Sequence, residues 1–251
     1  MNKRPSFPAK LDFSSGQSKL SRPAPAPAAV SQGHGMDSSA VRMNMVRKLA
    51  GQGITDATVL SAMGLIERHR FVDSALVNQA YEDTSLPIGL GQTISKPGVV
   101  ARMLELLRQG GSARLGRVLE IGTGCGYQAA VLSQLATEVY SIERLRGLHE
   151  KARDNLRHLR LANLHLLFGD GMLGYPKGAP YAAIIAAAGG EAVPQAWIDQ
   201  LALGGRIVAP VHRGPGAAGQ QALLVIDKTP QGLRQTMLET VLFVPIKSGV
   251  A

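Results

Sequence analysis

Two stretches of this sequence carry residue types and spacings that could do chemistry. The first lies between Glu120 and Glu143 and holds a glycine-rich turn formed by Gly122, Thr123, Gly124 and Gly126. Glycines let a ligand approach the backbone, and the N-terminus of a helix that follows such a turn faces the ligand. Glu143 lies 21 residues after Gly122, at the end of a second apolar run, where a carboxylate can accept from ribose hydroxyls. The pattern predicts a nucleoside cofactor site rather than an empty structural turn.

The spacing of the glycines also indicates which cofactor binds. A dinucleotide fingerprint is G-x-G-x-x-G, whose helix N-terminus receives a pyrophosphate. Here the order is G-x-G-x-G, and Tyr127 stands at the sixth position. Glu120, just before the turn, would repel a diphosphate and attract an ammonium group. S-adenosyl-L-methionine, an adenosine that carries an amino acid instead of phosphates, fits these residues best.

The second stretch is residues 83–97, in which small hydrogen-bonding side chains crowd a loop containing glycine and proline. Pro97 suits the first turn of a helix, which places Ser95 at or near the N-cap. Two interpretations of Ser95 stay open: its hydroxyl only caps the helix, or it helps to form an anion site that faces the cofactor. Asp170, after the third strand, also has two interpretations. It either accepts from an adenine amino group or only makes a turn with Gly171.

The composition limits the classes of protein to consider. A chain of 251 residues can hold one α/β domain with appendages. The net charge of +9 divides into +4 over residues 1–35 and +5 over the rest; it would suit an acidic substrate or nucleic acid without choosing between them. The single cysteine, Cys125, excludes an intramolecular disulfide and indicates a reducing compartment. Because neither a membrane span nor a secretory hydrophobic region is found, we expect a cytoplasmic protein.

The elements that must position these residues follow from periodicity and turn signals. Residues 1–35 are rich in proline and alanine and are predicted to be a disordered extension, whereas 36–251 are predicted to form the cofactor domain. A helical lead-in is expected from Ser38–Ala50, a helix capped by Thr55 and a short helix near Ser74–Ala80. Further helices are expected from Pro97, after Gly126, and over 145–160 and 193–203. Alternating β-rich runs predict a doubly wound, mostly parallel α/β sheet of seven strands: 118–121, 139–142, 164–168, 181–188, 206–211, 222–227 and 241–246.

Taken together, these motifs resemble the protein-L-isoaspartate (D-aspartate) O-methyltransferase family. The likeness runs over residues 36–247, and its most specific piece is Gly91-Gln92-Thr93-Ile94-Ser95, a loop that methyltransferases in general lack. The other matching pieces are Leu86-Pro87-Ile88-Gly89, Val100-Ala101, Val118 to Tyr127, Gly169-Asp170-Gly171 and Phe243-Val244-Pro245. The resemblance implies a Rossmann-like class I methyltransferase fold.

The resemblance also implies a repair enzyme. Such an enzyme transfers a methyl group from S-adenosyl-L-methionine to the free carboxyl of L-isoaspartyl and D-aspartyl residues in damaged proteins and peptides, and leaves S-adenosyl-L-homocysteine. By resemblance, Ser95 is the active-site residue and Thr93 lines the same loop. The cofactor is then held, without a metal, by the glycine turn, Glu143, Asp170 and Gly171. A carboxyl with a pKa of about 4 is already ionised at neutral pH, so Ser95 is expected to orient the substrate carboxylate rather than act as a nucleophile.

Three positions near the expected peptide groove depart from the family pattern. Gly98 replaces a bulky residue, Ala187-Ala188-Gly189-Gly190 stands where Thr-Ala-Ala-Pro is common, and Leu242 stands where arginine is common. The segment 187–190 also lacks the Asn/Asp-Pro-Pro-aromatic turn with which amino-methylating enzymes handle a flipped base, so no nucleic-acid partner is expected. A small-molecule O-methyltransferase and a non-catalytic S-adenosylmethionine binder are the alternatives. We expect a monomer that does not bind membranes.

Overall fold

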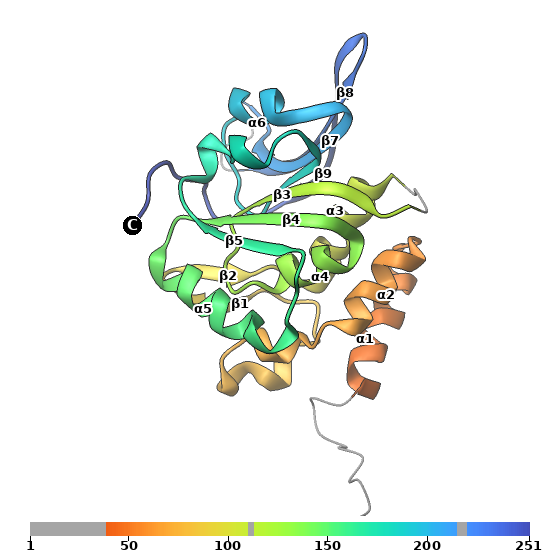
Figure 1. Cartoon of the computed structure of the whole chain (residues 1–251). Helices are drawn as coiled ribbons and strands as arrows, with labels where there is room; N and C mark the ends of the chain where they lie inside the picture. Colours follow the sequence, from red (N-terminus) through yellow and green to blue (C-terminus); the bar gives the residue numbers. More distant parts are fainter. Residues whose placement is uncertain (1–38, 110–112, 215–219) are drawn as a thin grey trace, which may run out of the picture. The chain divides into compact units, whose positions relative to one another are not determined.

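The computed structural model describes residues 39–109, 113–214 and 220–251. The predicted extension, residues 1–35, lies outside the described residues. Those described are organised around one seven-stranded sheet with helices on both faces (Figure 1). Among them, no helix combines the length and apolar character that crossing a membrane would need.

The main sheet confirms the predicted fold class. Its strands are β3 (Leu115–Ile121), β4 (Ala136–Glu143), β5 (Leu164–Phe168), β6 (Tyr181–Ala186), β7 (Leu201–His212), β8 (Gln221–Thr229) and β9 (Gly232–Val241). They lie in the order β5-β4-β3-β6-β7-β8-β9, parallel from β5 to β7 and antiparallel from β7 to β9. The strand order reverses between β3 and β6. Ligands of such sheets bind beyond the carboxyl ends of the strands at this switch point.

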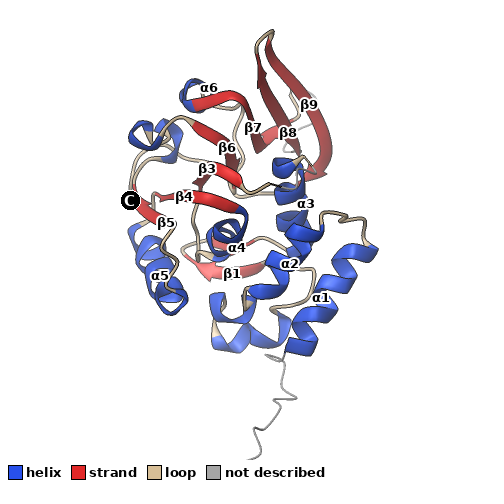
Figure 2. Ribbon diagram, turned by 45° about the vertical axis from the view of Figure 1, so that its right-hand side comes forward, coloured by secondary structure: helices blue, strands red, loops and turns tan. Residues whose placement is uncertain are grey.

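Helices cover the two faces of the sheet unequally. The α-helices are α1 (Ser39–Gly51), α2 (Ala57–Leu65), α3 (Pro97–Arg108), α4 (Tyr127–Leu135), α5 (Arg146–Leu156) and α6 (Gln195–Gln200). Successive strand residues point to opposite faces, so Val118 joins a large core with α1 to α5, while Leu119 joins a smaller core with Trp197 of α6. Figure 2 shows α6 above the strands, with α4 and α5 below them. The larger core therefore carries the helical lead-in.

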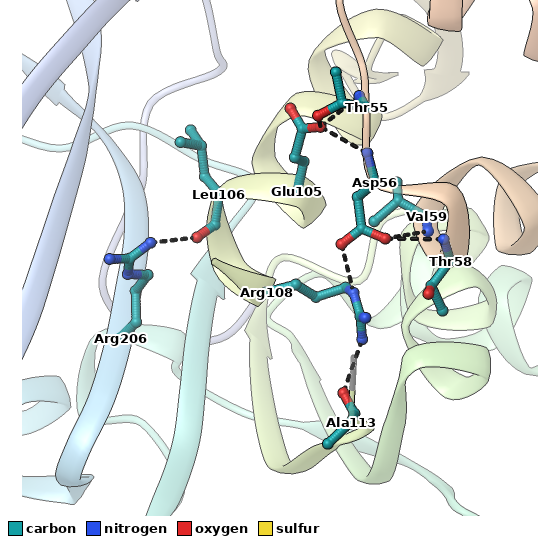
Figure 3. A network of polar contacts seen from close by, with 9 residues as sticks. All are labelled: Thr55, Asp56, Thr58, Val59, Glu105, Leu106, Arg108, Ala113 and Arg206. Atoms are coloured by element: carbon teal, nitrogen blue, oxygen red, sulfur yellow. Dashed lines mark hydrogen bonds and ion pairs between the residues drawn. The ribbon is translucent and has the colours of Figure 1, made fainter. Parts of the chain in front are cut away.

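Polar contacts fix the lead-in to α3 (Figure 3). Glu105 of α3 accepts hydrogen bonds from the backbone amides of Thr55 and Asp56 at 2.7 and 2.9 Å. Asp56, not Thr55, caps α2, because its carboxylate accepts from two amides of the first turn. The prediction of Thr55 was therefore wrong by one residue. The Thr55 hydroxyl instead donates to Glu105, a partner 50 residues away that local sequence does not reveal.

Asp56 also forms a buried ion pair with Arg108, whose Nε lies 2.8 Å from Oδ2. Burial disfavours ionisation of Asp56, but the hydrogen bonds from Arg108 and from the amides of the first turn outweigh it and lower the pKa of Asp56. The stability that this pair contributes is present above the ordinary pKa and is lost as pH falls through the lowered pKa. α2 and α3 are thus joined at a buried point.

The predicted loop 83–97 contains a small hairpin. β1 (Leu86–Gly89) pairs antiparallel with β2 (Gln92–Ile94), and the chain reverses through Leu90 and Gly91, both with positive φ. The sequence hid these strands because they are short and lie among glycine and proline. The hairpin matters for the site, since it ends one residue before Ser95.

Two elements near the C-terminus also differ from expectation. The last strand was predicted at 241–246 but is β9, whose side chains are mostly exposed, so no apolar pattern marks it. The helix predicted over 193–203 is the shorter α6, because β7 begins at Leu201, whose position beside Tyr181 continues the sheet. Residues 242–246 instead leave the sheet and form part of the site.

Candidate active site

A cavity of about 410 Å³ lies beyond the carboxyl ends of β3 and β4. Both chemistry-bearing stretches of the sequence line it, although more than twenty residues separate them along the chain. The predicted site residues that it brings together are Thr93, Ser95, Gly122, Thr123, Gly124, Glu143 and Gly171. Glu120, Gly126 and Asp170 do not line it.

The glycine turn takes the backbone geometry that its sequence demands. Gly122, Gly124 and Gly126 adopt φ of +89°, +57° and +92°, a region that other residues rarely occupy. The turn begins with two amides, of Gly122 and Thr123, donating to the Ile142 carbonyl of the neighbouring strand. Gly126 then forms the N-cap of α4. The cavity wall here is made of backbone, so a ligand can approach closely.

Glu143 is held by two backbone amides of residues that line the cavity. Its Oε2 accepts from the Gly124 amide and its Oε1 from the Leu145 amide, both at 2.9 Å. The side chain is buried, yet it lines the cavity. Each carboxylate oxygen can accept more than one hydrogen bond, so both retain capacity for hydroxyl groups of a ligand.

Glu120 lies behind the turn, with none of its surface exposed. It accepts a hydrogen bond from Ser141, whose hydroxyl is also bonded to that of Thr123 at 2.6 Å. Burial raises the pKa of Glu120 to about 8, against the opposing hydrogen bond from Ser141 and with a further increase from the charge of Glu143. The carboxyl is therefore neutral at pH 7 and supports the turn through Ser141 and Thr123.

Asp170 uses its carboxylate on the protein's own backbone. Oδ1 accepts from the Met172 amide at 2.8 Å and Oδ2 from the Gly249 amide at 2.6 Å. Its neighbour Gly171 lines the cavity, and a Cβ there would lie 2.5 Å from the side chain of Ile121. Asp170 therefore fixes the chain around Gly171, which must lack a side chain to pack on β3.

Ser95 does not cap the helix that follows it. The N-cap of α3 is Lys96, and no side chain makes a capping hydrogen bond there; the capping interpretation of Ser95 is wrong. The amide of Gly98 in the first turn donates to Asp83 at 2.7 Å instead. Within the described residues no hydrogen bond uses the Ser95 hydroxyl, and Ser95 lines the cavity together with Thr93. Its hydroxyl is available to a ligand.

Arg68, a residue that sequence reasoning missed, fixes the backbone at Ser95 through a hydrogen bond. Its side chain is fully buried, and its guanidinium donates to the carbonyls of Ala80 and Ser95 at 2.7 and 2.8 Å. It also lies 4.8 Å from the ring centre of Tyr127, at the start of α4. Burial lowers the pKa of Arg68. The only signal in the sequence was a basic cluster, which is usually exposed.

The opposite wall is formed by residues 244–247, a segment held by Gly189 and, through the preceding Phe243, by Gln221. Gln221 accepts from the amide of Phe243 at 2.7 Å and donates to its carbonyl at 3.2 Å. Gly189 donates to the Val244 carbonyl and accepts from the Ile246 amide. A Cβ on Gly189 would lie 2.5 Å from the Gln221 amide nitrogen. Glycine at this departure from the family pattern thus makes room for the Gln221 contact.

Gly98, another departure, has a similar physical reason. A Cβ at this position would lie 2.9 Å from an oxygen of Asp83, the carboxylate that accepts the Gly98 amide.

Among the described residues, no group of three or more His, Cys, Asp or Glu could hold a metal ion. The cavity therefore offers a backbone-lined cradle, an accepting carboxylate and one uncommitted serine.

Comparisons with known proteins agree with this geometry. The model of the protein-L-isoaspartate (D-aspartate) O-methyltransferase family matches residues 40–251. The chain belongs to this family. A protein-L-isoaspartate O-methyltransferase of Leptothrix cholodnii is 60% identical over 225 residues, covering 89% of this chain and 79% of the relative. One of Methylibium petroleiphilum is 54% identical over 262 residues, covering 98% of this chain and 96% of the relative.

Solved structures share the same fold. A protein-L-isoaspartate O-methyltransferase structure aligns with a TM-score of 0.74 and 29% identity, covering 83% of this chain and 67% of that one. A second structure, from Plasmodium falciparum, aligns with a TM-score of 0.69 and 21% identity, covering 82% of this chain and 98% of that one. It is described as a putative protein-L-isoaspartate O-methyltransferase in complex with S-adenosyl-L-homocysteine. Membership confirms the predicted fold, enzyme class, methyl donor and repair reaction of this methyltransferase. Its substrates are proteins with damaged aspartyl residues.

Proposed function

We propose that the 410 Å³ cavity holds S-adenosyl-L-methionine against the glycine turn and Glu143, and that Ser95 orients the free carboxylate of an isoaspartyl residue toward it. The observation that carries this proposal is the Ser95 hydroxyl, which lines the cavity and is not used within the described part of the protein.

The cofactor side of the cavity fits a nucleoside that bears an amino acid instead of phosphates. The glycine turn admits the ligand to the backbone, and Glu143 keeps acceptor capacity for ribose hydroxyls. Gly171, which has no side chain, also lines the cavity, and Asp170 fixes the chain around it. We assign Glu120 a supporting role behind the turn, because its neutral, fully buried carboxyl acts through Ser141 and Thr123.

The substrate side needs little acid–base machinery. When bound, S-adenosyl-L-methionine supplies a methyl group whose bond to sulfur breaks as its bond to the carboxylate oxygen forms, leaving S-adenosyl-L-homocysteine. The substrate carboxyl is already ionised at neutral pH, with a pKa of about 4, so no residue must remove a proton. Ser95 donates to one carboxylate oxygen and leaves the other to react. Thr93 and the 243–246 segment exclude water around it.

The partners follow from this chemistry. We propose that the enzyme works as a cytoplasmic monomer on exposed, flexible segments of damaged proteins, without a nucleic-acid or membrane partner. An open cavity that reaches the surface beside the β1–β2 hairpin supports access by such segments. The single, buried Cys125 is consistent with a reducing compartment.

The test compares methyl transfer to an isoaspartyl peptide with transfer to its aspartyl counterpart. We expect turnover of the isoaspartyl peptide only. Ser95→Ala should lower kcat about 10- to 100-fold, because one hydrogen bond to a charged group is lost, while S-adenosyl-L-homocysteine binds unchanged in calorimetry. Ser74→Ala, at an exposed serine, is the matched control.

The alternatives predict different results in the same assay. A small-molecule O-methyltransferase would bind the cofactor and modify neither peptide, but would turn over a free carboxylic acid. A non-catalytic binder would bind S-adenosyl-L-homocysteine and transfer no methyl group. An unchanged kcat for Ser95→Ala would refute the role of Ser95.

A further inference from the structure

A second cavity, of about 440 Å³, adjoins the cofactor cavity. The two share Thr93, Ser95, Ala187 and Val244 in their walls. The second cavity therefore begins where the substrate carboxylate is expected to sit. A peptide that presents this carboxylate to Ser95 must place its neighbouring residues there, because Ser95 also lines the first cavity, which the proposed function gives to the cofactor.

Part of the wall of the second cavity is apolar, beside the polar Ser85, Gln220 and Thr240. This apolar part is formed by the end of β9 and by α3, through Val99, Val241, Leu242 and Phe243. Leu242 is 87% exposed, the most exposed large apolar side chain among those described. Such a wall can cover the backbone and aliphatic carbons of an extended peptide, which offsets the cost of exposing Leu242 to water.

One charged side chain lines the second cavity. Lys96, at the N-cap of α3, is exposed and is the only charged residue among the described residues that line the cavity. It takes part in none of the ion pairs formed in the described part of the protein. The acids of α3 and β9, Glu105 and Glu239, both pair with Arg102, and Asp83 accepts the Gly98 amide.

We propose that this second cavity binds the residues next to the isoaspartyl residue and that Lys96 selects substrates with an acidic neighbour there. The inference rests on the proposed function of Ser95 and names a substrate preference within it. An exposed charge pair is weak and screened by salt. The preference is therefore a two- to tenfold effect on KM at low salt, not a requirement for turnover.

A rival role for Lys96 makes a different prediction. If its ammonium contacted the reacting carboxylate itself, its removal would weaken every isoaspartyl peptide equally, whatever the neighbouring residue. Peptides that differ in the charge next to the isoaspartyl residue distinguish the two roles. Only if Lys96 selects an acidic neighbour will the effect of a Lys96 substitution on KM differ from one peptide to another.

The experiment uses isoaspartyl peptides that carry Glu, Gln or Lys immediately before or immediately after the isoaspartyl residue. Each is methylated by the full-length wild-type enzyme, Lys96→Gln and Lys96→Glu at low salt. Lys177→Glu is the matched control, because it changes net charge equally at an exposed site that precedes β6, at the opposite end of the parallel strands.

At one flanking position, the wild type should show a KM two- to tenfold lower for Glu than for Lys, with kcat unchanged. Lys96→Gln should abolish this preference and Lys96→Glu should reverse it, whereas Lys177→Glu should retain it. Raising the salt concentration to 0.5 M should weaken the wild-type preference. Equal KM values for all peptides, or a preference that survives Lys96→Glu, would overturn the inference while leaving the proposed function intact. If the wild type methylates no isoaspartyl peptide, the proposed function itself fails.

Discussion

The two sides of the cavity are built in different ways. The cofactor side, residues 118–143 with Gly171, is nearly one continuous stretch, and its contacts are made largely by backbone groups. The substrate side is assembled from segments far apart in the chain, among them Arg68, residues 93–96, residues 187–190 and residues 242–246. There, the buried side chains of Arg68 and Gln221 and the backbone of Gly189 hold the segments together across long stretches of chain.

This difference indicates which substitutions should disturb each side of the cavity. The shape of the cofactor side depends on local backbone conformation, so a few glycines and two acids largely specify it. The position of Ser95 depends on Arg68, 27 residues earlier, and the opposite wall depends on Gln221, 22 residues before Phe243. Changes to such distant supports should alter the substrate side and leave cofactor binding intact.

The largest expected effect is on the substrate side. Arg68→Met removes the donor to the buried carbonyl of Ala80 and to the partly buried carbonyl of Ser95, so it should lower the free energy of unfolding by about 2–4 kcal/mol. A displaced Ser95 should also lower kcat roughly 10- to 100-fold. Urea denaturation and isoaspartyl-peptide kinetics measure both. Arg70→Met, whose side chain is 49% exposed, should change neither; equal kcat values for the two variants would contradict the role of Arg68.

The next effect is on the cofactor side and depends on pH. The pKa of Glu120 is about 8 in the folded protein and near its ordinary 4.5 when unfolded, so the unfolded chain releases this proton first. The stability of the wild type therefore falls as pH rises between these values. Glu120→Gln cannot ionise, so its stability relative to wild type should rise by about 2 kcal/mol between about pH 5.5 and 7.

Denaturation curves at several pH values measure this difference. The exposed Glu82→Gln is the control and should show no such pH dependence relative to wild type. A constant difference between Glu120→Gln and wild type across this range would show that Glu120 is ionised in the folded protein.

A smaller effect separates cofactor affinity from peptide affinity. Glu143→Gln replaces a charged acceptor by a neutral one beside the cavity, so the Kd for S-adenosyl-L-homocysteine should rise about tenfold, or about 1.4 kcal/mol. The peptide KM at saturating cofactor should not change. Calorimetry and steady-state kinetics provide the two values, with the exposed Glu150→Gln as control. A higher peptide KM with unaltered Kd would reverse the assignment of the two sides.

The smallest effect concerns the departure at Gly189. In Gly189→Ala the new methyl group would displace Gln221 from Phe243, so the peptide KM should rise about three- to tenfold, or about 1 kcal/mol. The Kd for S-adenosyl-L-homocysteine should be unchanged. Gly51→Ala, where a Cβ meets nothing within 4 Å, is the control. If cofactor affinity and peptide KM changed together, the two sides would not be separable.

Much of the fold could be predicted because strands β3 to β8 have clear apolar runs, and glycines or acids mark their ends. β9 could not, since its side chains are mostly exposed and its place is fixed by pairing with β8. The hairpin β1–β2 was hidden for another reason: its strands are too short for alternation to show.

The sequence by itself determined the glycine turn, the acid at the end of β4 and the serine-bearing loop, because each is a local pattern whose chemistry depends on neighbours in the chain. Only the tertiary structure decided that Ser95 is free rather than a cap, that Glu120 is buried behind the turn, and that Lys96 faces a second cavity. The physical reason is that hydrogen-bond commitment, burial and exposure depend on contacts between distant segments. No pattern along the chain records them.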